Sequence, residues 1–112
     1  MNITTTAHAT DLISILAECA DTCNQCALAC LGEEDVKMLR NCIRLDLDCA
    51  QICQLTASLL SKGSPFSKHI LKLCAEACRQ CATECEKHAD MSHCRKCAEI
   101  CHSCADMCEG RD

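Results

Sequence analysis

Apolar residues and cysteines recur every third or fourth residue along most of the chain, and charged residues fill the positions between them. The clearest unit is Cys-x-x-Cys-Ala-x-x-Cys, which begins at Cys23, Cys78, Cys94 and Cys101. Positions three and four apart lie on one face of a helix, so this spacing predicts amphipathic helices that carry a stripe of cysteine. No segment shows the strict alternation of a strand, and we expect an all-α fold.

Turn signals divide the pattern into four predicted helices, at about residues 10–31, 33–62, 65–88 and 90–109. Gly32 follows the first helix, and the Lys62–Pro65 segment combines a glycine stop with a serine N-cap and a proline suited to a first helical turn. Short connections make neighbouring helices antiparallel. We therefore expect a single domain over residues 1–112, an up-down-up-down four-helix bundle with a cysteine-lined interior. Residues 1–9 are expected to form a flexible N-terminal extension.

Each stripe, continued along its helix, gives an inward face to that helix. The predicted inward residues are Leu12, Leu16, Cys19, Cys23, Cys26, Cys30; Met38, Cys42, Leu45, Cys49, Cys53, Thr56, Leu60; Phe66, Ile70, Cys74, Cys78, Cys81, Cys85, His88; and Cys94, Cys97, Cys101, Cys104, Cys108. Because Leu45 stands where the second stripe would hold another cysteine, this wall should bind fewer ions.

The predicted topology gives the two ends of the bundle different chemistry. One end collects an apolar plug made of Leu12, Ile15, Leu16, Leu59, Leu60, Phe66, Ile70 and Leu73. The other end collects soft or borderline donors, which are Cys30, Met38, Cys85, His88, Met91, His93 and Cys94. We expect the first end to be sealed and the second to be an entrance.

Composition excludes several classes of function. The 112 residues include 16 cysteines, one aromatic residue and a net charge of −5, with neither a basic cluster nor a stacking platform for nucleic acid. The first apolar run is short, interrupted and not preceded by Lys or Arg, so we expect no secretion signal and no membrane span. The chain should then stay in the reducing cytosol, where disulfides are rare. No paired carboxylates suit acid–base catalysis, and we expect a protein that is not an enzyme.

Three interpretations of the cysteines differ in what they require. As plain small hydrophobes they would make a poor core, because each buries little more area than alanine. As stored disulfides they would need a specific geometry and an oxidising compartment. As metal ligands they would act as thiolates, and the interior would then hold up to 16 negative charges that need compensation.

Charge compensation favours a monovalent ion. Four tetrahedral Zn²⁺ ions would leave about half of the thiolate charge uncompensated, and iron–sulfur clusters held by four thiolates also stay negative. Cu(I), at one ion per thiolate, gives neutrality, and soft thiolate and thioether ligands select it. Neighbouring cysteines on one helix also have Cβ atoms roughly 5–6 Å apart, which suits a low-coordinate ion between two sulfurs. The sequence thus predicts multiple Cu(I) ions per chain.

The candidate metal ligands include every cysteine and three further residues. His88 continues the third stripe, although a histidine beside Lys87 also suits an exposed helix end. His93 precedes Cys94 at the expected entrance, and Met38 is in register with the second stripe, where packing is the alternative role. The complete set is Cys19, Cys23, Cys26, Cys30, Cys42, Cys49, Cys53, Cys74, Cys78, Cys81, Cys85, Cys94, Cys97, Cys101, Cys104, Cys108, His88, His93 and Met38.

A second apolar stripe on the outer side of the second helix predicts self-association. Leu39, Ile43 and Leu47 would be either lateral core or an exposed patch, and exposed patches often mark interfaces. We expect a homo-oligomer.

Several motifs together resemble the cytosolic bacterial copper storage proteins. They are the Cys23–Cys30 repeat, the Cys42–Asp46 stretch that leads to Cys49, the Gly63–Phe66 turn, and the Glu84–His88 segment followed by His93-Cys94. The resemblance implies a four-helix bundle that stores, buffers and detoxifies Cu(I), histidines near its open end, a tetramer, and proteins that deliver or accept copper. The alternative function from another class is a zinc or iron–sulfur redox or electron-transfer module.

Overall fold

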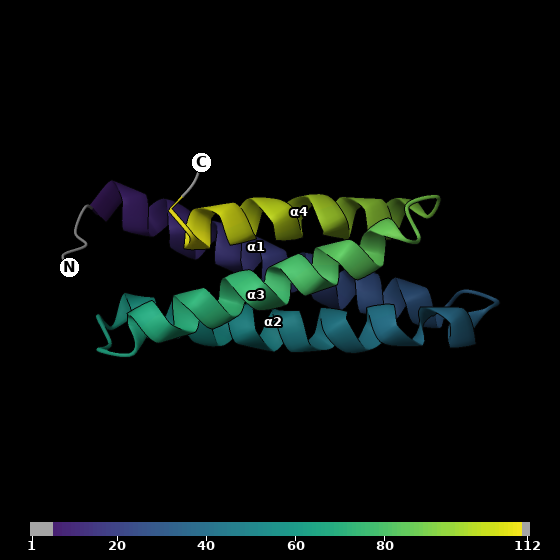
Figure 1. Cartoon of the computed structure of the whole chain (residues 1–112), viewed down its shortest axis with the longest axis horizontal. Helices are drawn as coiled ribbons and strands as arrows, with labels where there is room; N and C mark the ends of the chain where they lie inside the picture. Colours follow the sequence, from purple (N-terminus) through teal and green to yellow (C-terminus); the bar gives the residue numbers. More distant parts are fainter. Residues whose placement is uncertain (1–5, 111–112) are drawn as a thin grey trace.

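Four α-helices make up the fold in the computed structural model, which describes residues 6–110 and the side chains of residues 10–110 (Figure 1). A short 3₁₀-helix, η1, precedes the second of them. The elements are α1 (Thr6–Leu31), η1 (Val36–Leu39), α2 (Arg40–Ser61), α3 (Ser67–Glu86) and α4 (Ser92–Cys108). Strands do not occur over this part of the chain, so the predicted all-α class is confirmed.

The helices form a closed ring in chain order. α1 packs on α2, α2 on α3, α3 on α4, and α4 returns to pack on α1. The molecule is an elongated bundle that measures 47 × 21 × 17 Å, with its helices along the long axis (Figure 1). This arrangement confirms the predicted up-down-up-down topology. From residue 6 to residue 110, no helix is both long enough and apolar enough to cross a membrane.

The first two predicted helices have different starting points in the structure. α1 begins at Thr6 rather than near residue 10, so part of the predicted flexible extension is helical, and residues 1–5 lie outside the described residues. The helix predicted over residues 33–62 is wrong at its start, because the chain turns after Gly32 and winds as η1 before α2 begins at Arg40. This tighter winding shifts the face of every residue before Arg40.

On each helix, cysteine faces the axis of the bundle and alanine faces a neighbouring helix. Fifteen of the 16 cysteines are buried, and Cys108 is half-buried. Each alanine that follows a stripe cysteine lies one step around the helix and packs where two helices meet, which lets their backbones approach closely. These buried alanines are Ala20, Ala27, Ala50, Ala75, Ala82, Ala98 and Ala105.

The end opposite the α1–α2 connection is closed by fewer apolar residues than predicted. Leu12 and Leu16 are buried, and Thr56 is buried with its hydroxyl donating to the Ile52 carbonyl at 2.6 Å. Phe66 is 63% exposed and Leu73 is 47% exposed, so their predicted place in the plug is wrong. α3 begins only at Ser67, after a turn in which Gly63 has φ +64, and Phe66 belongs to that turn rather than to the inward face.

Candidate metal centre

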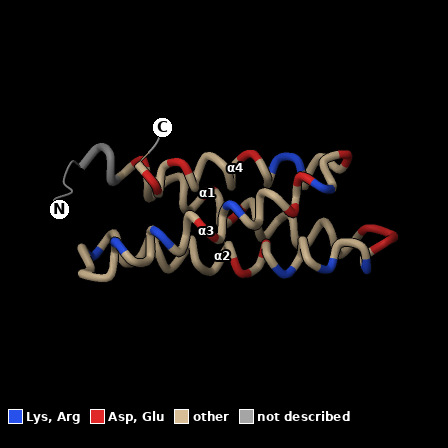
Figure 2. The backbone as a smooth tube through the Cα atoms, viewed as in Figure 1, with Lys and Arg blue, Asp and Glu red and all other residues tan. Residues whose placement is uncertain are grey.

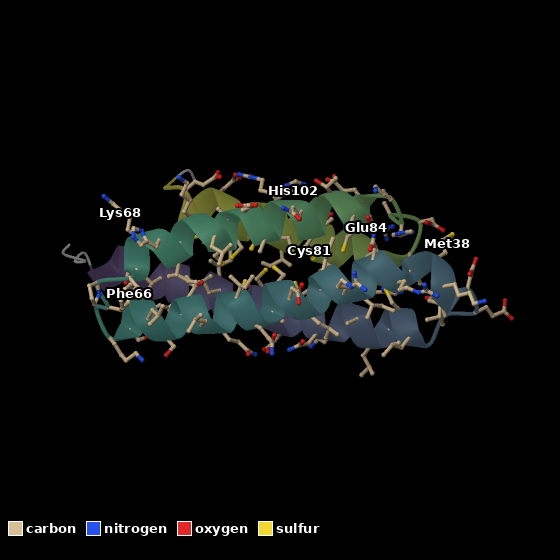
Figure 3. The ribbon with its side chains drawn as sticks, turned by 60° about the horizontal axis from the view of Figure 1, so that its bottom comes forward. Met38, Phe66, Lys68, Cys81, Glu84 and His102 are labelled. Atoms are coloured by element: carbon tan, nitrogen blue, oxygen red, sulfur yellow. The ribbon has the colours of Figure 1, made fainter. Side chains whose placement is uncertain are left out.

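Sulfur atoms from different helices meet along the axis of the bundle. Cys49 and Cys78 lie 3.6 Å apart, and the Sγ atom of Cys53 lies 3.7 Å from that of Cys74. Each pair joins α2 to α3, and Figure 3 shows sulfur atoms between the ribbons, with Cys81 directed into the interior. The stripes predicted from the sequence therefore converge on a common axis.

Groups of four sulfurs form in the deeper part of this interior. One group takes a single cysteine from each of the four helices, and its ligand atoms all lie within 4.8 Å of one another. The deep groups use sulfur alone, and they are Cys19/Cys53/Cys78/Cys104, Cys19/Cys23/Cys49/Cys101 and Cys23/Cys81/Cys97/Cys101. Several sulfurs belong to two groups, so one thiolate is placed to bridge two neighbouring metal ions.

His93 joins the sulfurs at the end where α1 finishes and α4 begins. Its Nδ1 atom lies 3.5 Å from the sulfur of Cys94, 3.7 Å from that of Cys26 and 3.8 Å from that of Cys30. Its Nε2 atom lies 3.0 Å from Oε2 of Glu33, in the acidic turn after α1 (Figure 2). A carboxylate on one ring nitrogen orients the other nitrogen toward a metal. The structure therefore brings His93 to the cysteines that the sequence placed beside it.

Asp46 is a residue of the interior that the sequence analysis did not include. Its side chain is fully buried, and its Oδ1 atom lies 3.1 Å from the Cys81 sulfur, 3.3 Å from the Cys97 sulfur and 3.6 Å from the Cys85 sulfur. The inward position predicted for Leu45 is wrong, because Leu45 is only half-buried and Asp46 takes the inward face.

The spacing of the second stripe allowed this error. Leu45 is three residues after Cys42 and four before Cys49, and Asp46 is four after Cys42 and three before Cys49. Both choices satisfy the spacing of one helical face. The signal that favours Asp46 is its chemistry, because a carboxylate among thiols adds a metal-binding oxygen. In the structure, the ligand atoms of Asp46, Cys26, Cys85 and Cys97 lie within 4.8 Å of one another.

Two other predicted ligands have different surroundings. The Nε2 atom of His88, in the turn after α3, is 3.2 Å from a carboxylate oxygen of Glu84 near the end of α3, and this histidine is buried beside that partner. Met38 is 57% exposed at the end of the bundle, and the buried position belongs to its neighbour Leu39 (Figure 3). The interior position predicted for Met38 is wrong because η1 does not continue the register of α2.

The protonation of these groups follows from burial and from their neighbours. Burial raises the pKa of Cys30 to about 11 and raises the pKa of Cys94. A hydrogen bond with Cys101 lowers the pKa of Cys19, because a thiol donor stabilises a neighbouring thiolate. Burial also raises the pKa of Asp46 to about 8. Burial thus favours the neutral thiol form of Cys30 and Cys94, and metal binding to these two sulfurs must release their protons.

Sulfur positions alone fit more than one metal. The cross-helix separations of 3.5–3.9 Å include the sulfur spacing of roughly 3.8 Å that tetrahedral zinc requires. A single helix supplies no more than part of each group, and the sets of four form because different helices contribute their sulfurs. Charge compensation remains the physical argument for a monovalent ion, because it depends on the number of buried thiolates and not on their spacing.

Known proteins share both the sequence pattern and the fold. A family model described as copper storage protein matches residues 5–111. An uncharacterized cysteine-rich protein of Bacillus subtilis, YhjQ, is 45% identical over 83 residues, which cover 74% of this chain and 76% of that protein. The Cu(I)-bound copper storage protein BsCsp3 is 42% identical, with a TM-score of 0.87 over 92% of this chain and 96% of that one.

A cytosolic copper storage protein from Streptomyces lividans is similar in two copper-loaded structures. The structure with five coppers is 40% identical, with a TM-score of 0.89 over 93% of this chain and 91% of that one. The structure loaded with 10 copper equivalents is 38% identical, with a TM-score of 0.92 over 97% of this chain and 86% of that one. On the family match and these relatives, the chain belongs to the copper storage protein family.

Proposed function

We propose that this protein stores copper by binding many Cu(I) ions through thiolates inside the four-helix bundle, and so buffers the ion below toxic levels. The observation that carries the proposal is the interior itself, in which 15 buried cysteines from four helices replace an ordinary apolar core. One monovalent ion per thiolate leaves such an interior neutral, whereas divalent ions leave it negative. This role is binding rather than catalysis, and we assign it to the cytosol, as for the Streptomyces lividans relative.

The proposed ligand set follows the structure rather than the sequence pattern at two positions. It contains the 16 cysteines, His93 and Asp46, because His93 Nδ1 and Asp46 Oδ1 lie among the sulfurs. It leaves out Met38, which is exposed. His88 belongs to the set only if its Nδ1 atom is used, since Nε2 already contacts Glu84.

Copper enters, in this proposal, at the end that holds His93. The acidic turn of Glu33, Glu34 and Asp35 lies at this end and attracts cations, while Glu33 orients the imidazole (Figure 2). Lys62, Lys68 and Lys72 lie around the α2–α3 turn, at the opposite end. Proteins that deliver or accept copper would meet the His93 end, and the family resemblance favours a tetramer.

An anaerobic titration of reduced protein with Cu(I), against a competing chelator, tests the storage function. We expect an end point of ten ions or more per chain. The Cys108→Ser variant is a matched control, because Cys108 is the half-buried cysteine and its loss should lower the end point by about one ion. An end point of one to four ions would contradict storage.

Elemental analysis distinguishes copper storage from the alternative function with zinc or iron–sulfur. Protein from copper-fed cells should contain copper and be colourless, whereas an iron–sulfur form would be brown. Zinc at about one ion per four cysteines, without copper, would favour the alternative, which the sulfur spacing permits.

A further inference from the structure

Two buried cysteines at the entrance end lie close enough to react with each other. Cys42 is in the first turn of α2 and Cys85 is in the last turn of α3, and these helix ends lie at the same end of the bundle (Figure 1). Their sulfur atoms are 3.5 Å apart, and both side chains are fully buried. Because a disulfide bond is about 2.05 Å long, sulfur movement of roughly 1.5 Å would join the two.

A single carboxylate contacts both thiols of this pair. The Cys85 thiol donates to Oδ1 of Asp46 at 3.6 Å, and the Cys42 thiol donates to Oδ2 of the same residue at 3.9 Å. Asp46 lies one turn after Cys42 on α2 and is fully buried. With one oxygen for each thiol, the carboxylate holds the two sulfurs side by side. This arrangement favours their reaction, because groups that are already positioned lose little freedom when they join.

The donors beside this pair suit oxidised copper as well as reduced copper. The Nδ1 atom of His93 lies 3.7 Å from the Cys26 sulfur, and Nε2 of the same ring contacts Glu33. Imidazole nitrogen and carboxylate oxygen bind Cu(II) well, whereas thiolates select Cu(I). Cys26 connects these donors with the pair, because its thiol also hydrogen-bonds to Cys42 and Cys85. A Cu(II) ion at His93 would therefore lie next to two thiols that can reduce it.

We infer that Cys42 and Cys85 form a redox-active dithiol that reduces Cu(II) to Cu(I) at the entrance of the bundle. Two Cu(II) ions each accept one electron. The two S–H bonds break, one S–S bond forms between Cys42 and Cys85, and two protons pass to solvent. The products are two Cu(I) ions and one disulfide. A low-molecular-weight thiol then restores both cysteines by two thiol–disulfide exchanges.

The deeper sulfur groups supply a driving force for this reaction. Thiolates bind Cu(I) in preference to Cu(II), so transfer of Cu(I) to the groups that contain sulfur alone draws the reduction forward. The copper ion is itself the oxidant, so the disulfide does not require an oxidising compartment. The inference rests on the proposed storage function and adds an activity at its entrance.

Anaerobic addition of two Cu(II) ions per chain, supplied as a glycine complex, tests this activity on the reduced full chain. We expect the electron paramagnetic resonance signal of Cu(II) to disappear and the free thiols to fall by two from 16. Acid quenching stops thiol–disulfide exchange, because exchange needs a thiolate. Mass spectrometry after trypsin digestion should then find residues 41–44 joined to residues 80–87 through Cys85 rather than Cys81. A persistent Cu(II) signal, or disulfides spread over several pairs, would overturn the inference.

Two serine variants separate this pair from thiol chemistry in general. Cys42→Ser removes one member of the pair. Cys74→Ser is the matched control, because the Cys74 sulfur lies 3.7 Å from that of Cys53 across the same two helices, toward the closed end. We expect Cys42→Ser to slow Cu(II) reduction by roughly 10-fold or more, and Cys74→Ser to slow it by less than about twofold. Equal rates in the two variants would overturn the inference.

Direct titration with Cu(I) distinguishes a failure of this activity from a failure of copper storage. Loading with Cu(I) needs no thiol oxidation, and each variant lacks one sulfur ligand. Both variants should therefore reach the same end point, about one ion below that of the wild type. If Cys42→Ser loses helical structure, the position of the disulfide in the wild-type protein decides the matter.

Discussion

The two ends of the bundle differ in the atoms that fill them. At the closed end, Leu12, Leu16 and Thr56 pack as an ordinary interior with few metal-binding atoms. Toward the opposite end, His93 Nδ1 lies 3.5 Å from the Cys94 sulfur, and Asp46 Oδ1 lies 3.1 Å from the Cys81 sulfur. Between the two ends, the groups contain sulfur alone. The bundle therefore has a small apolar core at one end and a long interior of metal-binding atoms. The stability of that interior depends on the ions it binds.

This difference separates two sources of stability. The closed end gains free energy from buried apolar area whether or not metal is present. The thiol-lined part gains little from area, and it gains most from the ions that its thiolates bind. Four predictions test this separation, and they are arranged from the largest expected effect to the smallest.

Copper loading should raise the melting temperature by roughly 15–30 °C. A ligand that binds only the folded state at a thousandfold excess over its Kd adds about 4 kcal/mol, and 1 kcal/mol shifts Tm by about 4–8 °C in a domain of this size. Circular dichroism of anaerobic protein with and without Cu(I) measures the change. An unchanged melt would show that the ions bind at the surface.

The Leu16→Ala variant should lose roughly 2–5 kcal/mol of metal-free stability, because Leu16 is fully buried at the closed end. The Phe66→Ala variant is the control and should change stability by less than about 0.5 kcal/mol, since Phe66 is 63% exposed. Urea unfolding of reduced protein gives both values. A similar loss in both variants would mean that Phe66 belongs to the apolar plug after all.

The Asp46→Asn variant should stabilise the metal-free protein by roughly 1–3 kcal/mol at pH 8. Burial raises the pKa of Asp46 from 3.8 to about 8 in the folded state, so the contribution of this carboxyl is fully present below pH 3.8 and is lost as the pH rises to 8. Asparagine has no such loss. The gap between the two unfolding curves should widen from pH 4 to pH 8, and parallel pH profiles would contradict this account.

The His93→Ala variant should slow Cu(I) uptake by roughly tenfold and lower the total capacity by no more than one ion, because the loss affects one ligand at the entrance. His102→Ala is the matched control, since His102 pairs with Glu86 on the outer surface. Stopped-flow transfer from a Cu(I) chelator measures both rates. Equal rates for the two variants would place the entrance elsewhere.

Most of the fold was predictable because cysteine spacing and turn residues are local signals. The three-and-four spacing fixes a helical face over many turns, and the Lys62–Pro65 segment lies between α2 and α3 as expected. The sequence also placed His93 beside the cysteines of the entrance, where the structure has it. Its role as a ligand stays a prediction until metal binding is measured.

The errors arise where a local signal is ambiguous by one residue. Leu45 and Asp46 both fit the spacing of the second stripe, and neighbouring residues on a helix differ by about 100° in direction. Hydrophobicity favoured the leucine, whereas the interior of this protein takes the carboxylate. Met38 was misplaced because a 3₁₀ turn changes the winding before α2, and no residue in that segment signals the change.

The leucines that close one end have a consequence for copper release in the proposed storage function. Leu12 and Leu16 are buried across the bundle there, so in our proposal copper leaves by the His93 end through which it entered. On this proposal, ions near His93 exchange before those beside Leu16. One molecule would then hold copper ions that exchange quickly near His93 and copper ions that exchange slowly deeper in the bundle. No conformational change would be needed to separate the two.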